Sequence, residues 1–319
     1  MAVNYATYGA PREELGVAFM EHVADASEFV GLEVFPTARV KHKSGDFSAI
    51  TRETLLQDVE TARAKGSTYN RADFGAKDKS FACKEHGIEV PIDASEKSLY
   101  MNDFDADDVA TKVGAEILMR RHEKRVAAAV QDTALFTGAA YFTDFSANPW
   151  TTVGTDIIGQ IVDKTEVVRK NCGRKAGALI IGAGLVPGLL KNTGIRAQLP
   201  ATPIITLDLL KAALPGILGL QRIIIGGAVR NSAIEGQAAV VADIWGDTYA
   251  MLAVIADKGS PMNTPCLGRT MLWVPDSPNE VMAESYPENQ SRSEVFRFRH
   301  HVDELLLDKN FGHLMDVKA

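Results

Sequence analysis

Cysteine is scarce in this chain, and its scarcity limits the chemistry that the protein can contain. The 319 residues include three cysteines, Cys83, Cys172 and Cys266, which stand far apart in the sequence. This spacing fits neither a disulfide framework nor a zinc site made of paired cysteines. We therefore expect free thiols in a reducing compartment.

Long hydrophobic runs and an excess of positive charge are also missing. The longest uncharged run, 176–190, has 15 residues, fewer than the roughly 20 needed to cross a bilayer. The first residues have neither a basic start nor an apolar segment, so nothing indicates a secretion signal. A net charge of −7 argues against a surface that wraps nucleic acid. With 46% hydrophobic and 24% charged residues, the chain is a globular protein large enough for two compact units.

No complete signature of an enzyme occurs. The turn Gly182–Gly188 follows a predicted strand, as a dinucleotide-binding turn does, but its glycines are spaced G-x-G-x-x-x-G and not G-x-G-x-x-G. Pro187 also stiffens this turn. We interpret it as a tight connection between a strand and a helix.

Two other groups of residues match functional sites by type alone. His301, Asp303 and His313 could imitate an iron site with two histidines and one carboxylate. His86 lies near Cys83, as a base does near a nucleophile. Ordinary polar surface residues explain both groups, and we predict no catalysis, no cofactor and no metal.

Residues 39–90 form a long stretch that is too polar to bury itself. It holds 10 Lys or Arg and 8 Asp or Glu, with only scattered large apolar residues. Residues 39–43 and 46–51 are expected to form a hairpin around Ser44–Gly45, and 88–92 to return as an edge strand because it contains Pro91. A polar excursion of about 50 residues is unusual inside a compact domain. Its missing core is therefore predicted to come from another copy of the chain.

Helices are predicted on both sides of this stretch. Residues 11–27 form a short amphipathic helix, with Phe19 and Val23 on its apolar face. Residues 105–132 form a long helix with acidic residues at its start and basic residues later, as the helix dipole favours. Its apolar residues recur every fourth position at Val109, Val113 and Ile117. At 1.5 Å per residue it is about 40 Å long, and we expect it to lie as a beam on an antiparallel sheet.

The following region alternates helices with strands, which is typical of an α/β unit. Helices are predicted at 155–171, 185–191 and 206–213, and strands at 178–181, 223–225, 238–242 and 248–255. A final alternating strand, 294–307, is predicted to return to the sheet beneath the long helix. The α/β unit is then an insertion into the domain that surrounds it.

The order of these elements resembles the major capsid protein of tailed bacteriophages, which has the Hong Kong 97-type fold. The resemblance spans nearly the whole chain. Its most specific pieces are EFVGLEVFP at 28–36, ALIIG at 178–182 leading into VPGLL at 186–190, and IIIGGA at 223–228 followed by IWG at 244–246. These are sequence habits of the family, and their order carries the resemblance.

The resemblance implies an α+β fold with an N-terminal arm, an extended β-hairpin loop, a spine helix on an antiparallel sheet, and an inserted α/β axial domain. The arm and first strand are expected at 1–38 and the excursion loop at 39–92. The peripheral domain is expected at 93–152, with the spine helix at 105–132, and again at 276–319, where it ends in the C-terminal strand. The axial domain is expected at 153–275.

The same resemblance implies a non-enzymatic protein of the virion, assembled in the host cytoplasm and without contact to a membrane. Copies would form pentamers and hexamers of an icosahedral head shell, which encloses double-stranded DNA without sequence-specific binding. Scaffolding, portal and decoration proteins are further expected partners. Because the arm begins at Met1 without room for a scaffolding segment, a separate scaffolding protein or none is expected.

Contacts between subunits are expected at seven residues of the loop and the first helix: Arg63, Lys65, Arg71, Lys77, Lys79, Phe19 and Val23. Exposed charge pairs contribute only about 0 to 1 kcal/mol each, so they would set register more than strength. Two alternatives stay open. One is a nicotinamide-dependent oxidoreductase that uses the Gly182–Gly188 turn, and the other is an encapsulin-like compartment shell with the same fold.

Overall fold

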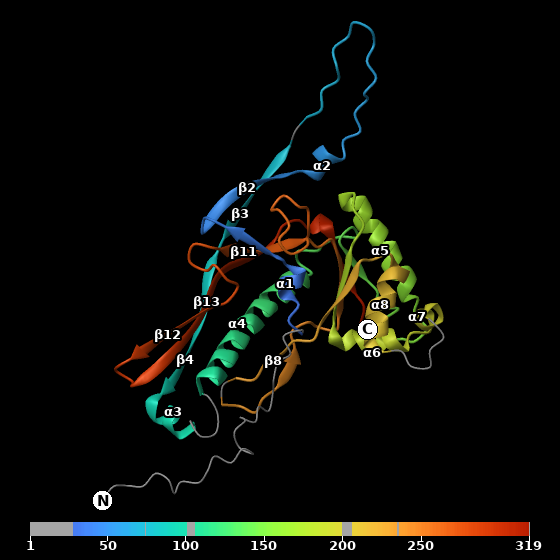
Figure 1. The fold of residues 1–319 in the computed structure, drawn as a ribbon. Coiled ribbons are helices and arrows are strands. Elements are labelled where there is room, and N and C mark those ends of the chain that lie inside the picture. The colour runs from blue at the N-terminus through green and yellow to red at the C-terminus, as the bar shows by residue number, and fades with distance from the viewer. Residues whose placement is uncertain (1–27, 74, 101–105, 200–205, 235, 319) are drawn as a thin grey trace, which may run out of the picture.

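Two five-stranded sheets and one long helix organise the protein (Figure 1). The computed structural model describes residues 28–73, 75–100, 106–199, 206–234 and 236–318. The helix predicted at 11–27, with Phe19 and Val23, lies outside the described residues.

The first sheet is built around the long strand β13 (Ser293–Leu306). Along one of its edges β13 pairs first with β12 (Met282–Glu288) and then with β11 (Gly268–Trp273), and along the other with β4 (Lys84–Asp93). These three pairings are antiparallel, whereas β1 (Thr37–Val40) adds to β11 in parallel. Helix α3 (Ala94–Tyr100) follows β4 directly.

The long helix α4 (Ala106–Val130) lies across this sheet, within the predicted span (Figure 1). Val109, Val113 and Ile117, which recur every fourth residue, do not form the buried face of α4: that face lies one residue later, and Val113 is 40% exposed. Gly114 explains the offset: a Cβ atom there would lie 2.2 Å from the Phe298 ring, so only glycine lets the helix approach the sheet this closely. The buried residues of α4 are Ala110, Gly114, Leu118, His122, Glu123, Val126, Ala127 and Val130.

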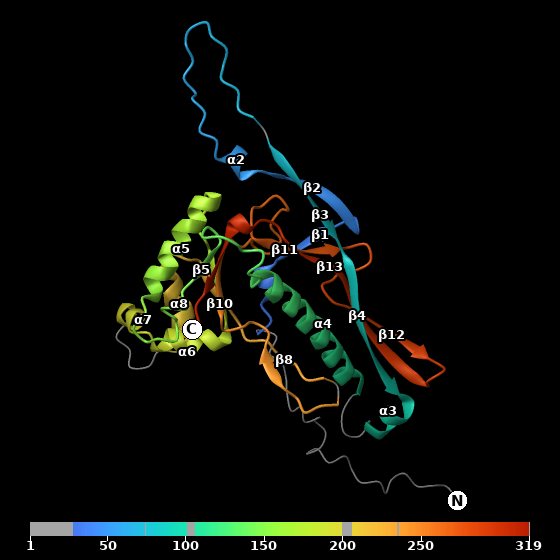
Figure 2. The ribbon, with the colours of Figure 1, turned by 180° about the vertical axis from the view of Figure 1, so that it is seen from behind.

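The second sheet has the strand order β5 (Phe142–Asp144), β14 (Gly312–Asp316), β10 (Tyr249–Ala253), β6 (Ala178–Gly182) and β7 (Arg222–Gly226). Four helices cover one face of it: α5 (Ile157–Cys172), α6 (Val186–Lys191), α7 (Thr193–Gln198) and α8 (Leu207–Leu218) (Figure 2). The short 3-10 helices η4 (Ala183–Leu185) and η5 (Lys309–Phe311) complete this part.

The other face of the second sheet packs against the C-terminal half of α4. Val126 and Val130 of α4 share a core with Ile180, Met251 and Leu314 of the sheet. Helix α1 (Gly31–Val34), which occupies part of the region where a strand was expected, contributes to the same core. The long helix therefore joins the two sheets, because its two halves are buried against different sheets.

The two sheets do not follow the predicted domain boundaries, because each contains strands from a span predicted for the other domain. Strand β11 falls inside the span predicted for the axial domain, yet it belongs to the first sheet, and β5 and β14 belong to the second sheet although they fall in spans predicted to be peripheral. The reason is burial, since Leu314 and Met315 of β14 fill opposite faces of the second sheet and are fully buried. An alternating pattern shows that a segment is a strand but not which sheet it joins.

Two two-stranded sheets project from the body at opposite ends (Figure 1). One is the pair β2 (Ser44–Ile50) and β3 (Ala76–Ala82), between which lies helix α2 (Arg52–Leu55). The other is the pair β8 (Val229–Asn231) and β9 (Val241–Asp243). Within the described ranges, no helix combines the length and the apolar character needed to cross a membrane.

Candidate assembly interface

A two-stranded ribbon with a long loop at its end projects from the body of the protein (Figure 1). Its strands β2 and β3 are antiparallel, with Ser44 opposite Ala82 and Ile50 opposite Ala76. The hairpin predicted around Ser44–Gly45 was therefore wrong, because these residues begin β2 and its partner lies much later in the chain. The residues expected to pair with β2 are used elsewhere, since Arg39 and Val40 extend β1 along β11.

The base of the ribbon is fixed to the body by a small apolar cluster. Cys83 is buried with Ala38 and Met271, and Phe81 at the end of β3 packs against them. The backbone N–H of Ala82 donates to a carboxylate oxygen of Asp303 in β13 at 2.9 Å. The ribbon is a separate two-stranded sheet whose base is fixed to the first sheet.

The loop beyond the ribbon, residues 56–73, has no core of its own. Every residue in it is exposed except the half-buried Val59. Only a few bonds cross between its two arms, among them Gln57 Nε2 donating to the carbonyl oxygen of Asp73 at 3.2 Å and Asn70 Nδ2 donating to that of Glu60 at 2.7 Å. A loop with so little internal contact needs a surface outside the subunit to be held in one arrangement.

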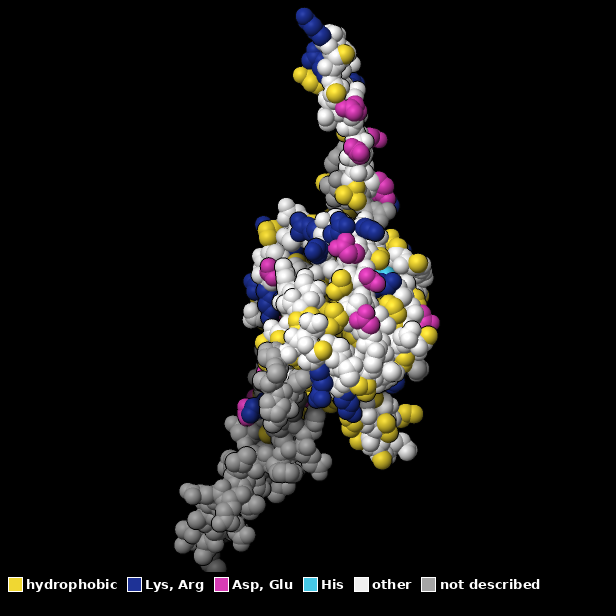
Figure 3. Space-filling model, turned by 90° about the vertical axis from the view of Figure 1, so that its right-hand side faces the viewer, with side chains coloured by type: hydrophobic (Ala, Val, Ile, Leu, Met, Phe, Trp, Pro, Cys, Tyr) yellow, Lys and Arg dark blue, Asp and Glu magenta, His cyan; other side chains and the backbone are white. Residues whose placement is uncertain are grey.

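Charge is divided along this loop. The acidic residues Asp58 and Glu60 lie nearer the ribbon, whereas Arg63 and Lys65 lie at the far end, which Figure 3 shows as dark blue at the free tip and magenta further down. The Arg63 guanidinium lies 4.7 Å from the centre of the Tyr69 ring, and Tyr69 is 72% exposed. The tip therefore offers cations and an aromatic face, a combination suited to binding an acidic surface.

The residues predicted to make subunit contacts fall into separate groups. Arg63, Lys65 and Arg71 are exposed in the loop, as a contact role requires. Lys77 and Lys79 lie instead on β3, opposite Ala49 and Phe47, and line a hollow of about 570 Å³ between the ribbon and the body. The described members of the predicted set therefore lie on two separate surfaces.

A second exposed surface escaped the sequence reasoning. In the β8–β9 hairpin, on the side of the molecule opposite the loop, Ile234 is 82% exposed, Val240 56% and Val241 70% (Figure 1). The sequence predicted a strand at 238–242 but not that it would be exposed. The sequence signal that could have indicated this exposed surface is the pair Val240 and Val241 next to small and polar residues.

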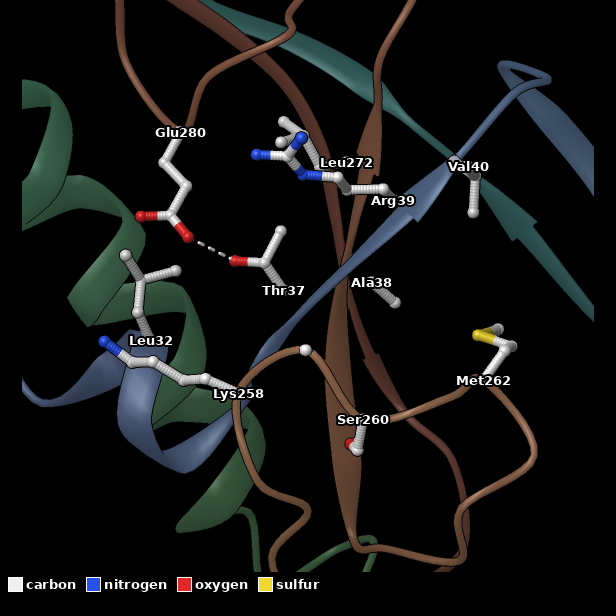
Figure 4. Close-up of a pocket in the computed structure, with 11 residues that line it drawn as sticks. Leu32, Thr37, Ala38, Arg39, Val40, Lys258, Ser260, Met262, Leu272 and Glu280 are labelled. Atoms are coloured by element: carbon white, nitrogen blue, oxygen red, sulfur yellow. Dashed lines mark hydrogen bonds between the residues drawn. The ribbon is translucent and has the colours of Figure 1, made fainter.

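A third surface is the free edge of β1, where a hollow of about 530 Å³ opens beside Leu272 (Figure 4). Thr37 donates its hydroxyl proton to Glu280 at 2.7 Å, and Arg39 and Lys258 lie at the rim. Among the described residues, β1 pairs with β11 on one side and with no strand on the other. An unpaired edge of this kind can accept an extended segment of another chain.

The Gly182–Gly188 turn has no space for a dinucleotide. A Cβ atom on Gly182 would lie 2.5 Å from the carbonyl oxygen of Trp245, and one on Gly188 would lie 2.7 Å from that of Trp150. These glycines are needed because the chain packs against its own backbone there. The space beside these two glycines, which a bound pyrophosphate would need, is filled by the backbone of the chain itself.

The residues that resembled an iron site are divided between the two sheets. His301 lies in β13 and its Nδ1 is 2.6 Å from a carboxylate oxygen of Asp276. His313 lies in β14, where its ring bonds Thr143 Oγ1 at 2.9 Å and the carbonyl oxygen of Ala140 at 3.1 Å. Burial lowers the pKa of His313 to about 4. Within the described ranges, no three potential metal ligands of the His, Cys, Asp or Glu type lie together.

Cys83 and His86 do not form a nucleophile and base. Burial and the nearby Asp303 carboxylate raise the pKa of the Cys83 thiol to about 11, so it stays protonated at neutral pH. Its Sγ faces the carbonyl oxygen of Met271 at 3.6 Å. The thiol belongs to the cluster that fixes the ribbon.

Comparison with known proteins gives these surfaces a context. The chain is 26% identical over 243 residues to the major capsid protein of Burkholderia phage BcepMu, covering 75% of each. The solved structure of a phage-related protein from Bordetella bronchiseptica RB50 matches with a TM-score of 0.68 at 17% identity, covering 92% of this chain and 93% of that one. The capsid of Myoviridae phage XM1 matches with a TM-score of 0.58 at 9% identity, covering 94% and 95%. No protein-family model matches the chain.

This is the Hong Kong 97-type capsid fold. The predicted resemblance to tailed-phage major capsid proteins is confirmed, and so is the α+β fold class. In this chain the long helix α4 lies across the first sheet, and residues 56–73 project from the body.

Proposed function

We propose that this chain is the major capsid protein of a tailed bacteriophage. Its copies assemble into pentamers and hexamers of an icosahedral head shell around double-stranded DNA. The observation that carries this proposal is the loop 56–73, which projects from the body and has no core, in a chain with a capsid fold over nearly its whole length. A neighbouring subunit supplies the surface that the loop lacks.

Head-to-tail contact explains how such a loop produces a closed shell. When each subunit places its loop on the next one, the contact is heterologous, and a suitable rotation closes it into a ring. A projecting loop adds buried area between copies without disturbing the core of the subunit that carries it. Many weak contacts of this kind then stabilise one large particle.

The charge of the chain suits confinement of DNA better than tight binding of it. Each subunit carries a net charge of −7, so a shell of many copies gains little from counterion release on DNA. The shell then retains the genome by enclosing it. We infer a location in the virion after assembly in the host cytoplasm, with scaffolding, portal and decoration proteins as further partners.

The alternatives lose support for different reasons. An oxidoreductase built on Gly182–Gly188 lacks the space for its cofactor, because the backbones at Trp150 and Trp245 fill it. An encapsulin-like compartment shares the fold, but the sequence relative that supports this proposal is named a phage major capsid protein. We infer a structural and not an enzymatic role.

Electron microscopy and sizing of the purified full chain test the proposal. Closed shells, or rings of five and six subunits, are the expected result. A stable monomer or dimer at all concentrations and salt conditions would overturn it, and a bound nucleotide in that sample would favour the oxidoreductase. Shells that contain host enzymes in place of nucleic acid would favour the compartment.

A loop replacement provides the matched control. Because Thr51 and Gly75 follow the last pair of the β2–β3 ladder, residues 52–74 can be replaced by Asn-Gly, which suits a two-residue hairpin turn. We expect a folded subunit with an unchanged unfolding transition and no closed shells. A variant that unfolds would show that the loop belongs to the subunit core.

A further inference from the structure

The excursion loop is closed at its base by hydrogen bonds among Thr51, Thr54 and Gly75, which we call the threonine clasp. The N–H of Gly75 donates to Thr54 Oγ1 at 2.9 Å, and the N–H of Thr51 donates to the carbonyl oxygen of Gly75 at 3.2 Å. Thr51 Oγ1 and Thr54 Oγ1 are 2.9 Å apart. The three residues lie just beyond the last pair of the β2–β3 ladder.

Thr54 is the centre of the clasp. If Thr51 donates its hydroxyl proton to Thr54 Oγ1, the Thr54 hydroxyl is free to donate to the carbonyl oxygen of Gly75, 3.3 Å away. Both backbone groups of Gly75 are then bonded to one side chain, N–H to Oγ1 and C=O to the hydroxyl proton. A single hydroxyl group thereby joins the outgoing and returning arms of the loop.

Gly75 leaves little room in this arrangement. A Cβ atom on it would lie 3.1 Å from Thr54 Oγ1 and 3.2 Å from Thr51 Oγ1, which is tighter than ordinary van der Waals contact. The two hydroxyl groups can therefore approach the backbone of the returning arm this closely because residue 75 has no side chain.

The clasp lies where the direction of the loop is decided. Thr51 directly precedes α2, and Thr54 lies within it, so the clasp holds the short helix against the returning arm. Figure 1 shows the loop continuing from this point away from the body. Farther out, cross-loop bonds are sparse, so a change of angle at the clasp would displace the whole tip.

We propose that the threonine clasp aims the excursion loop at the neighbouring subunit, with Thr54 as a positioning residue for that contact. The inference rests on the proposed capsid function, since it assigns the clasp a part in the contact between copies. It adds that the direction of the base of the loop is set before assembly, within the free subunit. Fixing the base in advance reduces the entropy that each contact must overcome.

Amide hydrogen exchange on the unassembled full-length subunit tests the first half of the proposal. Thr54→Val removes the hydroxyl and keeps the branched shape, so the Gly75 N–H loses its acceptor. We expect exchange in peptides covering 51–55 and 75–77 to become roughly tenfold faster, as for loss of one or two hydrogen bonds. Peptides from α4 and β13 should exchange as in the unchanged protein.

Two further variants separate the clasp from a general effect of the substitution. Thr54→Ser retains the hydroxyl and should restore slow exchange. Thr111→Val removes an exposed hydroxyl of α4 that bonds the carbonyl oxygen of Asp107 at 2.8 Å, far from the loop, and should leave the loop peptides unchanged. Unchanged exchange at 51–55 and 75–77 in Thr54→Val would overturn the clasp.

Shell assembly tests the second half. Thr54→Val should give a folded subunit whose yield of closed shells falls several-fold, with recovery in Thr54→Ser. Faster exchange with a normal shell yield would show that the clasp exists but does not aim the loop, which would also overturn the proposal. If the unchanged protein forms no shells at all, the proposed capsid function fails and this positioning role fails with it, while the exchange data still decide whether the clasp exists.

Discussion

The carboxylate of Glu123, in the C-terminal half of α4, accepts a hydrogen bond from the indole nitrogen of Trp245 at 2.5 Å. It also accepts the backbone N–H groups of Val30 at 3.0 Å and Gly31 at 2.6 Å. One side chain thus connects α4, the start of α1 and the segment that leads into β10. Burial raises the pKa of Glu123, although the three donors oppose this shift.

Replacing Glu123 by glutamine should loosen this junction. An amide has one acceptor oxygen and brings two N–H donors into a site that already holds three, so some donors lose their partners. We expect Glu123→Gln to lower the free energy of unfolding by about 2 to 3 kcal/mol, measured by denaturant unfolding of the unassembled subunit. Trp245→Phe removes one donor and should still leave the two backbone donors bonded to Glu123. A glutamine variant as stable as the unchanged protein would contradict this account of the junction.

The close contact between α4 and β13 makes Gly114 intolerant of a side chain. Alanine there gains helix propensity but places its Cβ atom 2.2 Å from the Phe298 ring, so we expect Gly114→Ala to destabilise the subunit by about 1 to 3 kcal/mol. Gly216 in α8 is a matched control, since a Cβ atom on it would meet nothing within 4 Å. Gly216→Ala should stabilise by up to about 1 kcal/mol. Equal effects of the two substitutions in thermal unfolding would show that packing at Gly114 is not limiting.

The stability of the subunit should fall as the pH falls below neutral. Burial lowers the pKa of His300 and of His313 from 6.5 to about 4. Below pH 6.5 the unfolded chain takes up these protons and the folded chain does not. Each histidine therefore lowers the free energy of unfolding by up to about 1.4 kcal/mol per pH unit, down to pH 4. Denaturant midpoints measured between pH 7.5 and about 4.5 check this, and His313→Asn should flatten the profile.

Glu304 extends the loss to lower pH. Burial opposes ionisation of this carboxyl, but hydrogen bonds from His122 and Arg125 prevail and bring its pKa from 4.5 to about 2. Its contribution is therefore present above pH 4.5 and is lost as the pH falls toward 2.

The histidine prediction has a clear opposite outcome. A stability profile that stays flat from neutral pH down to pH 4 would contradict the buried state of His300 and His313.

The charges at the loop tip should affect assembly and not folding. Changing Arg63, Lys65 and Arg71 to glutamate leaves the subunit core untouched, because all three are exposed. We expect an unchanged unfolding transition and slower shell formation at low salt, with the difference from the unchanged protein shrinking above about 0.5 M salt as charges are screened. Light scattering against salt concentration measures this.

A control with the same change of charge separates the tip from net charge. Lys170, Arg174 and Lys175 are exposed basic residues at and beyond the end of α5. Their change to glutamate alters the net charge of the subunit equally. If both triple variants slow assembly to the same extent, the loop tip makes no specific charge contact.

Much of this protein followed from properties that are local in the chain. The polar character of 39–90 predicted a segment without a core, and the structure shows 56–73 exposed almost throughout. The distribution of charge and apolar residues predicted the long helix, and α4 occupies Ala106–Val130. The buried strands β6 and β7 were predicted from short runs of branched apolar residues. These features depend on neighbours a few residues away, so the sequence alone determined them.

The tertiary structure decided which segments meet. No local pattern identifies β3 as the partner of β2, or places β14 in the second sheet, because strand alternation is the same whichever partner is chosen. The buried face of α4 includes Gly114 and not the neighbouring Val113, because the helix passes close over Phe298 at Gly114. Two further contacts join residues that are far apart in the sequence and meet only in the folded chain. They are the hydrogen bond between Glu123 and Trp245 and the clasp at Thr54. Packing selects such pairs because buried polar groups must find partners wherever the fold brings them.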